Sequence, residues 1–307
     1  MPSAGYIWFD GKLVRVDDAK THVLDHSLHY GSAVFEGIKV NKISNNRLVI
    51  FRLDDHLERF LKSASTLKMS IAYTRKEVKK AIIDTLIANN IKSGCYIRPL
   101  VWFGSGELRL TPDRDSTRLM IAILRHNQNL LKKGVRPLRV MISSKTKPPP
   151  VSIPPHLKAA GVYLLSLLAQ YEAKEKGFED AILLDHNGHV AEGTSGNIFC
   201  VREGKLMTPP LHSILPGITR DTILELVKES KLKVSERTIT VNELTQSDEL
   251  FYSGTSWEIA PIGHVNGKRI SDGKIGPITA EIKKRYFEIV RGDNSRYKKW
   301  YTYVKLR

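Results

Sequence analysis

The sequence lacks long hydrophobic runs and has few cysteines. No stretch reaches the roughly eighteen apolar residues that a membrane-spanning helix needs. The two cysteines, Cys95 and Cys200, lie in apolar, strand-like segments, which favours buried thiols in a reducing cytoplasm over disulfides or metal ligands. The N-terminus shows neither a basic segment nor a small-residue cleavage site, so a folded strand is expected there rather than a signal peptide. We therefore expect a cytoplasmic protein with no membrane partner.

Several familiar motifs are also absent. The sequence has no P-loop, no complete G-x-G-x-x-G, no G-x-S-x-G and no H-E-x-x-H. Gly104–Gly106 follows an expected strand, but Arg109 breaks the dinucleotide-binding pattern, so a loop is expected there. His22, His26 and His29 have the spacing of helical metal ligands. Because no fourth ligand is evident, they are expected to shape a loop, and no metal is predicted.

Positive charge is in excess, with 48 Lys and Arg against 32 Asp and Glu, which gives a net charge of +16. Such an excess can attract nucleic acids or membranes, or it can steer small anions towards a site. The basic residues are spread along the chain, and the basic, aromatic tail that begins at Lys298 is more often a solvated or packed terminus. We predict no nucleic-acid partner and keep a basic nucleic-acid-binding protein as the non-enzyme alternative.

The length of 307 residues favours about two domains in an α/β (α+β) fold. We expect a small N-terminal α+β domain at residues 1–124, a polar linker at 125–136 and a larger C-terminal domain at 137–307. Alternating apolar residues and turn signals predict strands at Tyr6–Phe9, Leu13–Val16, Val34–Val40, Leu48–Phe51, Tyr96–Phe103, Arg118–Leu124, Leu138–Ser143, Ala181–Asp185, His189–Ala191, Asn197–Val201 and Glu249–Tyr252.

Apolar residues at helical spacing predict helices beginning near Asp54 and after Thr74, and at Val162–Lys176, Thr219–Glu229 and Ile278–Val290. Asp54 is expected to be an N-cap, and Thr74 to form a capping box with Glu77. A proline-rich segment at residues 148–155 is too stiff for a helix and leads directly to Lys158.

The second half of the chain contains a long spaced pattern: Glu192–Phe199, Leu206–Thr208 and Leu215–Arg220. This pattern resembles the signature of class IV aminotransferases, the fold type IV enzymes of pyridoxal phosphate (PLP). Further segments narrow the resemblance to branched-chain amino acid aminotransferases, namely His29–Gly31, Val34–Gly37, Tyr96–Leu100, Lys158–Tyr163 and Ser253–Thr255.

The resemblance implies a smaller N-terminal and a larger C-terminal domain with pyridoxal 5'-phosphate between them. It implies transamination between L-Leu, L-Ile or L-Val and 2-oxoglutarate, so the small-molecule partners are amino acids and 2-oxo acids. It also implies a homo-oligomer, at least a dimer, in which Tyr30 and the loop near Leu110 reach the neighbouring subunit's site.

The same resemblance assigns the cofactor to particular residues. Lys158 would be the catalytic residue and carry PLP as a Schiff base, since a lysine of lowered pKa is both nucleophile and proton carrier. Glu192 would hold the ring nitrogen protonated, and Tyr163 would hydrogen-bond the ring oxygen. A helix N-terminus and a cation suit a phosphate dianion; the remaining implied cofactor-binding residues are Arg59, Leu215 on one ring face, Ile218, Thr219 and Thr255.

The substrate-binding residues are also implied by resemblance. Backbone N–H groups of Thr255 and Ser256, with Tyr96 and Arg98, would bind the substrate carboxylate. Tyr30, Phe35 and Tyr163 would wall an apolar pocket for the side chain.

Three positions depart from the family pattern. Val162 stands where many relatives have Asn, and Arg109 and Trp257 put the amino-acid range in doubt. A D-amino-acid aminotransferase, an (R)-amine transaminase and an aminodeoxychorismate lyase of the same fold therefore remain alternatives. The segments around Tyr30 and Arg98 favour the branched-chain type.

Overall fold

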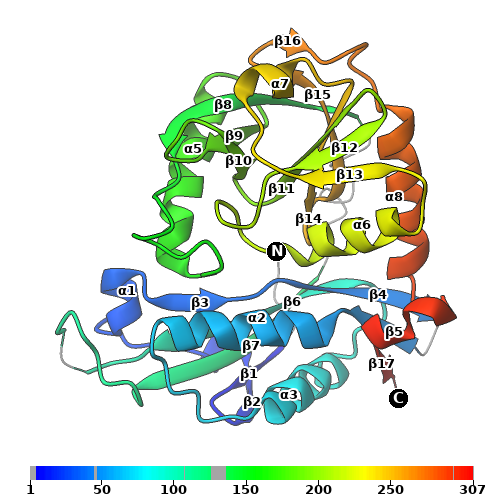
Figure 1. Cartoon of the computed structure of the whole chain (residues 1–307). Coiled ribbons are helices and arrows are strands. Elements are labelled where there is room, and N and C mark those ends of the chain that lie inside the picture. Colours follow the sequence, from blue (N-terminus) through cyan, green and yellow to red (C-terminus); the bar gives the residue numbers. More distant parts are fainter. Residues whose placement is uncertain (1–4, 45–46, 107, 126–135, 293, 307) are drawn as a thin grey trace. The chain divides into compact units, whose positions relative to one another are not determined.

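The chain forms two compact units in the computed structural model, which describes residues 5–44, 47–106, 108–125, 136–292 and 294–306 (Figure 1). Unit 1 comprises Met1–Gln128, Leu157–Val162 and Glu288–Arg307, and unit 2 comprises Asn129–His156 and Tyr163–Phe287. Almost all of the linker expected at 125–136 lies outside the described residues. The domain boundaries drawn from the sequence therefore stay a prediction.

Unit 1 is built on a sheet that has eight strands in the described residues, in the order β17-β5-β4-β6-β7-β1-β2, with β3 paired to β6. All its strand pairs are antiparallel. The strands are β1 (Tyr6–Phe9), β2 (Lys12–Arg15), β3 (Ala33–Phe35), β4 (Ile38–Ser44), β5 (Arg47–Phe51), β6 (Cys95–Phe103), β7 (Thr117–Arg125) and β17 (Tyr301–Lys305).

The helices of unit 1 are α1 (His26–Tyr30), α2 (Leu53–Thr66) and α3 (Arg75–Ala88), with 3-10 turns η1 (Val16–Asp18), η2 (Ala160–Val162) and η3 (Ser295–Trp300). Helix α3 begins with the predicted capping box, because Thr74 and Glu77 each cap the other's backbone N–H. The predicted N-cap of α2 is wrong. Arg52 takes that position, and Asp54 lies inside the first turn, where it pairs with Lys79 at 2.8 Å.

One expected strand is divided in two. The sequence predicts a single strand over Val34–Val40, whereas β3 and β4 are separated at Glu36 and Gly37. Both strands still pair with β6, at Val34–Val101 and at Ile38–Ile97. The interruption turns the Glu36 side chain into the interior, where it is fully buried, and this carboxylate becomes important for the candidate site.

Unit 2 is built on a sheet that has nine strands in the described residues, in the order β10-β9-β8-β15-β14-β11-β12-β13, with β16 paired to β15. Strand pairs β8–β9, β8–β15 and β12–β13 are parallel, and the others are antiparallel. The strands are β8 (Leu138–Thr146), β9 (Asp180–Leu184), β10 (Val190–Gly193), β11 (Asn197–Arg202), β12 (Lys205–Thr208), β13 (Lys233–Glu236), β14 (Glu249–Gly254), β15 (Glu258–Val265) and β16 (Lys268–Arg269).

The helices of this unit are α5 (Tyr163–Glu175), α6 (Ile218–Lys228), α7 (Val241–Thr245) and α8 (Pro277–Val290), the last of which ends in unit 1. Helix α5 packs on β8 and β9, and α6 packs on β13 and β14. In the sheet core the rings of Phe199 and Phe251 stack at 5.0 Å. The predicted mixture of strands and helices is confirmed.

Both cysteines are buried and free, as predicted. Burial raises the pKa of the Cys95 thiol to about 12 and that of the Cys200 thiol to about 11. Because the thiolate is the reactive form, both side chains are chemically inert in the folded chain.

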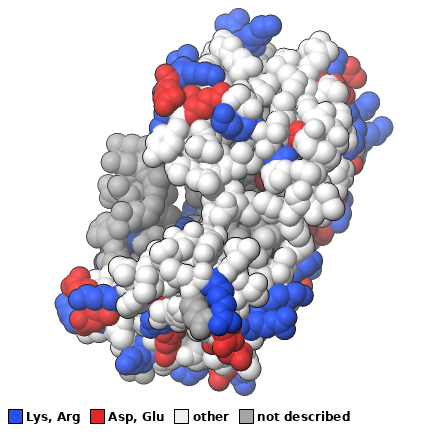
Figure 2. Space-filling view, turned by 90° about the vertical axis from the view of Figure 1, so that its left-hand side faces the viewer, with Lys and Arg blue, Asp and Glu red and all other residues white. Residues whose placement is uncertain are grey.

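The excess positive charge does not form a single patch on the face shown in Figure 2. On the face in Figure 2, Lys and Arg side chains are scattered and interspersed with Asp and Glu. Two aromatic residues of the basic tail, Trp300 and Tyr301, are buried, whereas Tyr303 is exposed. The Arg52 guanidinium lies 4.9 Å from the Trp300 ring. In the described part of the chain, no helix has the length and apolarity that a membrane crossing requires.

Candidate active site

The backbone around Lys158 is fixed within unit 1 by four contacts. Its N–H donates to Ser63 Oγ at 3.1 Å, and its carbonyl accepts from Phe35 N at 3.2 Å. Val34 and Ala159 form an isolated antiparallel bridge, and Gly161 N donates to Gly31 O at 2.9 Å. The segment that carries Lys158 therefore lies against residues 31–35, in the position of a short additional strand.

The close approach of the backbone at residues 31 and 161 requires glycine. Gly31 has φ +65°, a conformation that residues with a Cβ adopt at a cost. A Cβ at Gly31 would also lie only 3.0 Å from the Gly161 Cα. The close backbone contact between the end of α1 and the Lys158 segment thus depends on this residue.

The Lys158 amine and the Arg98 guanidinium lie beside the same aromatic ring. Lys158 Nζ is 4.9 Å from the Phe35 centroid, and Arg98 Cζ is 4.7 Å from it and 5.6 Å from that of Tyr96. Tyr96 and Arg98 are two residues apart on β6 and so face the same side. The buried Arg98 Nε has no hydrogen-bond partner among the described residues. Unit 1 therefore brings together four predicted site residues, Phe35, Tyr96, Arg98 and Lys158. They provide an amine, on Lys158, and a donor suited to an anion, on Arg98.

Arg59 is held by a buried carboxylate. Its Nε donates to Glu36 Oε1 at 2.6 Å and its Nη2 to Glu36 Oε2 at 2.9 Å. His56 Nδ1 lies 2.8 Å from Glu36 Oε2, and Gly37 N donates to the same oxygen at 3.1 Å. Glu36 accordingly has partners on both oxygens.

Burial and these contacts shift the pKa values of Glu36 and His56. Burial alone would raise the pKa of Glu36, but the charge of Arg59 and the hydrogen bonds from Arg59 and His56 hold it well below its usual range. Burial lowers the pKa of His56; Glu36 opposes this, and Arg59 and Lys158 add to it. Near neutral pH Glu36 is therefore ionised and His56 is neutral, with its Nδ1–H donating to Glu36.

Tyr30 and Leu110 lie at the surface of unit 1, apart from this cluster. The Tyr30 hydroxyl donates to the Leu108 carbonyl at 3.2 Å, and the two predicted side chains are 46% and 78% exposed. Two backbone contacts, His26 N to Gly104 O and the bridge Asp25–Ser105, join the same two segments. Helix α1 and the segment before it therefore contact the segment that leads to Leu110.

The predicted ring-nitrogen carboxylate, Glu192, stands on β10 in unit 2. Its Oε2 accepts from Asn197 Nδ2 at 3.0 Å and from Leu215 N at 3.2 Å, and its Oε1 contacts Lys147 Nζ. Its side chain is only 13% exposed. The sequence predicts Glu192 and Leu215 as two separate cofactor-binding residues, and in the structure a hydrogen bond joins them.

The same unit presents the N-terminus of α6 beside this carboxylate. Asn197 Nδ2 also donates to the Leu215 carbonyl at 2.9 Å. A Cβ at Gly217, the N-cap, would overlap Asn197 Oδ1, and no side chain caps the helix at this position. Ile218 and Thr219 are the first helical residues and are buried. Unit 2 thus places Glu192, Leu215, Ile218 and Thr219 in one connected region.

The remaining predicted residues of unit 2 lie at the ends of elements. Tyr163 begins α5, and Thr255 and Ser256 form the turn between β14 and β15. The Trp257 indole N–H donates to Ser195 Oγ at 2.9 Å, and its ring lies 6.0 Å from that of Tyr252. Trp257, one of the departures from the family pattern, thereby ties the Thr255–Ser256 turn to the loop before β11.

The three histidines near the N-terminus make loop contacts. His26 Nδ1 lies 2.8 Å from Ser32 Oγ, His29 Nε2 lies 3.0 Å from the Val23 carbonyl, and His22 Nδ1 accepts from Leu24 N. In the described residues, no group of three or more His, Cys, Asp or Glu side chains is arranged to hold a metal.

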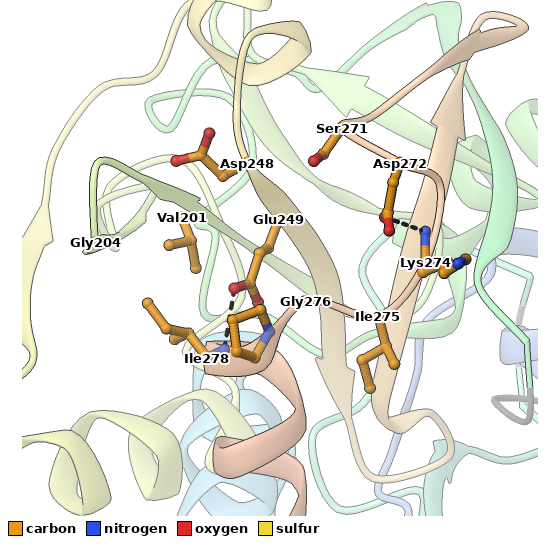
Figure 3. Close-up of a pocket in the computed structure, with 11 residues that line it drawn as sticks. Val201, Gly204, Asp248, Glu249, Ser271, Asp272, Lys274, Ile275, Gly276 and Ile278 are labelled. Carbon is orange, nitrogen blue, oxygen red and sulfur yellow. Dashed lines mark hydrogen bonds between the residues drawn. The ribbon is translucent and has the colours of Figure 1, made fainter.

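A cavity of about 360 Å³ opens in unit 2 at the start of α8 (Figure 3). Asp248, Asp272 and Lys274 line it. The Glu249 carboxylate in its wall accepts from Ile278 N at 3.0 Å and from Thr279 N at 2.6 Å, and so caps the helix. None of the predicted site residues lines this cavity. The Glu249 carboxylate has a structural role, because it caps α8.

Sequence reasoning gave no role to Glu36, His56, Ser63 or Asn197. One signal was available: His56, Arg59 and Ser63 recur at helical spacing on the face of α2 that also carries buried apolar residues. Polar side chains on a buried face need partners, and that requirement points to a counter-ion for Arg59. No local pattern singles out Asn197.

Proteins of known family resemble the chain over almost its full length. The family model described as amino-transferase class IV matches residues 33–265. The branched-chain-amino-acid aminotransferase of Pseudomonas aeruginosa is 38% identical over 305 residues, which cover 98% of each chain. That of Escherichia coli K12 is 39% identical over 296 residues, which cover 94% of each.

Solved structures agree with these sequence matches. The branched-chain amino acid aminotransferase of Thermobaculum terrenum, in its PLP-bound holo-form, has a TM-score of 0.91 at 34% identity, covering 99% of each chain. The enzyme of Thermoproteus uzoniensis, with norvaline, has a TM-score of 0.91 at 38% identity, covering 98% of this chain and 99% of that one. The predicted fold class, fold type IV, is confirmed.

Proposed function

Because the chain belongs to the class IV aminotransferase family, and within it to the branched-chain-amino-acid aminotransferases, we propose that it transfers an amino group between L-Leu, L-Ile or L-Val and 2-oxoglutarate. The cofactor of this reaction is pyridoxal 5'-phosphate. The observation that carries the proposal is the Lys158 amine, which lies near the Phe35 ring, as Arg98 does, on an anchored backbone.

Each unit holds residues whose chemistry suits one or more polar groups of the cofactor. When bound, PLP with a protonated ring nitrogen would supply an electron sink for the substrate Cα. Lys158 would hold the cofactor, and Glu192, which pairs with Lys147, would keep the ring nitrogen protonated. Arg59 and the start of α6 at Ile218 would bind the phosphate, as cations and helix N-termini do for dianions. Leu215, Tyr163 and Thr255 keep the supporting roles that the resemblance implies.

The chemistry proposed for Lys158 is proton transfer. With the substrate amine in its place on the cofactor, Nζ would take the proton from the substrate Cα as general base and deliver it to C4′ of the cofactor as general acid. Its fixed backbone restricts the places that the amine can reach, which is how positioning lowers the barrier of such a step.

Arg98 would receive the substrate carboxylate. Its buried Nε without a described partner is a donor that a bound anion would satisfy. Tyr96 and the N–H groups of Thr255 and Ser256 would assist. The ring of Phe35 beside Arg98 provides an apolar wall suited to a branched side chain.

The proposal includes a homo-oligomer, at least a dimer. In unit 1 the large apolar side chains of Val23, Leu28, Tyr30, Leu108 and Leu110 are exposed, and they lie in α1, just before it, or in the loop that contacts it. Exposed apolar residues gathered on one surface mark interaction sites. A cytoplasmic location is also proposed, which the buried thiols of Cys95 and Cys200 support.

A half-reaction panel tests this function. Purified protein carrying PLP is mixed with L-Leu, L-Ile, L-Val, L-Glu, D-Ala or an aryl amine, and loss of the lysine-bound cofactor's absorption band is followed. We expect the band to disappear with the branched-chain L-amino acids and L-Glu, and to persist with the other two amines. A response to D-Ala or to the aryl amine alone would favour the rival aminotransferases of this fold.

The non-enzyme alternative makes the opposite prediction. A basic nucleic-acid-binding protein would be colourless after incubation with PLP, and would bind DNA or RNA with an affinity that falls steeply with salt. The burial of Trp300 and Tyr301 counts against it, because stacking on bases needs exposed aromatic rings.

A further inference from the structure

We propose that Glu36, supported by His56, is a positioning residue that fixes the Arg59 guanidinium for the phosphate of the cofactor. This inference rests on the proposed function and deepens it. Neither Glu36 nor His56 would touch the reacting atoms; both act through Arg59.

The carboxylate fixes the plane of the guanidinium. Glu36 receives Arg59 Nε on one oxygen at 2.6 Å and Nη2 on the other at 2.9 Å. Two parallel N–H···O bonds of this kind set both the plane and the rotation of the group, whereas a single bond leaves rotation open. The directions of the other guanidinium N–H groups follow from this pair.

Glu36 is in turn held from two sides. His56 Nδ1 at 2.8 Å and Gly37 N at 3.1 Å both meet Oε2, and the side chain is fully buried. An ionised carboxylate in such a place is stable only when paired and hydrogen-bonded. The break between β3 and β4 allows this geometry, because it turns Glu36 inward and places Gly37 where a Cβ would overlap the Tyr96 hydroxyl.

One face of α2 connects this cluster to the catalytic lysine. His56 and Ser63 are two helical turns apart, and Arg59 lies between them. Ser63 Oγ accepts the backbone N–H of Lys158 at 3.1 Å. The helix therefore fixes the proposed phosphate cation and the lysine backbone in one frame, which suits a cofactor bound at both its phosphate and its aldehyde end.

Charge and orientation make opposite predictions for Glu36. A negative charge beside Arg59 opposes a phosphate dianion, so a purely electrostatic view predicts tighter cofactor binding when Glu36 is neutralised. Positioning predicts weaker binding, because the bidentate hold on Arg59 is lost. The sign of the change therefore decides between them.

The test compares PLP with pyridoxal, which has the same ring and aldehyde but no phosphate. Apoprotein with Glu36→Gln is titrated with each compound, and the dissociation constants are compared with wild type. We expect PLP binding to weaken about 10- to 100-fold, as for the loss of one charge-assisted hydrogen-bond pair, and pyridoxal binding to stay unchanged. Glu58→Gln, which removes an exposed charge from the same helix, is the matched control and should bind both like wild type.

A second pair of variants tests the same proposal if Glu36→Gln does not fold. His56→Leu removes the donor to Glu36, and His56→Asn restores an N–H in nearly the same place. We expect His56→Leu to weaken PLP binding several-fold without affecting pyridoxal, and His56→Asn to recover most of the loss. Unchanged or tighter PLP binding, or equal losses for PLP and pyridoxal, would overturn the positioning role. Wild-type protein that binds no PLP would instead overturn the proposed function itself.

Discussion

At the scale of single residues, Glu36 and His56 make the folded chain sensitive to acid. The folded pKa of Glu36 lies well below the value of the unfolded chain, so its stabilising effect is present above that value and is lost as pH falls. The pKa of His56 is also lowered, from an unfolded value of 6.5. Below that value the unfolded chain binds a proton that the folded chain refuses, which again favours unfolding on acidification.

We predict that the free energy of unfolding falls steeply as the pH drops below 6.5, the pKa of His56 in the unfolded chain. Each proton taken up only on unfolding steepens the dependence by about 1.4 kcal/mol per pH unit. Urea denaturation from about pH 7.5 to about pH 5 measures the slope in wild type and in His56→Asn, which cannot titrate. His186→Asn, at an exposed position, is the control; equal slopes in wild type and His56→Asn would refute the role of His56.

The residue types of the site were predictable from the sequence, and their partners were not. Lys158, Glu192 and Arg98 occupy matched positions in a spaced pattern, and the structure keeps Lys158 and Arg98 together around Phe35. Glu36 is 23 residues from Arg59 along the chain. Their contact depends on how β3 and α2 pack, and local sequence carries no such distance.

At the scale of elements, backbone contacts locate the Lys158 segment. Capping and periodicity predict α3 correctly, because its signals are local. They fail at the start of α2, where Arg52 adopts φ +53° and takes the N-cap position expected for Asp54. They also fail to divide β3 from β4, because both parts pair with β6 and only Glu36 and Gly37 separate them. Tertiary contacts decide both cases.

The glycine contact beneath Lys158 gives a prediction at this scale. Gly31→Ala should lower the free energy of unfolding by about 2–4 kcal/mol, from left-handed backbone strain and crowding against Gly161. Gly177→Ala is the matched control, since Gly177 also has positive φ, +76°, but no atom lies within 4 Å of its added Cβ. It should lose only the backbone term, about 1–2 kcal/mol.

Chemical denaturation of both variants separates strain from crowding, and PLP titration adds a functional readout. Gly31→Ala should also weaken PLP binding, because it displaces the segment that carries Lys158, while Gly177→Ala should bind PLP like wild type. Equal losses of stability in the two variants, with unchanged PLP binding, would show that the Gly31–Gly161 contact does not position the lysine.

At the scale of the whole molecule, the compact units do not follow chain order. Residues Leu157–Val162, with the lysine, and Glu288–Arg307 cluster with the N-terminal half. Strand β17 pairs with β5 over five residue positions, from Tyr301–Phe51 to Lys305–Arg47. Pairing between two segments so far apart in a chain of 307 residues leaves no mark in local periodicity, so the sequence could not predict it. The spaced family pattern identifies the fold because it spans both units.

The central claim is that Lys158, among the 48 Lys and Arg residues of the chain, is the one that holds the cofactor. Borohydride reduction of the PLP-loaded protein makes that link permanent, and peptide mass mapping then locates it. The account predicts a phosphopyridoxyl mass on the peptide that contains Lys158, and none on the corresponding peptide of Lys158→Ala, which should also be inactive in transamination. Modification of a different lysine in wild type, with Lys158 unmodified, would contradict the account.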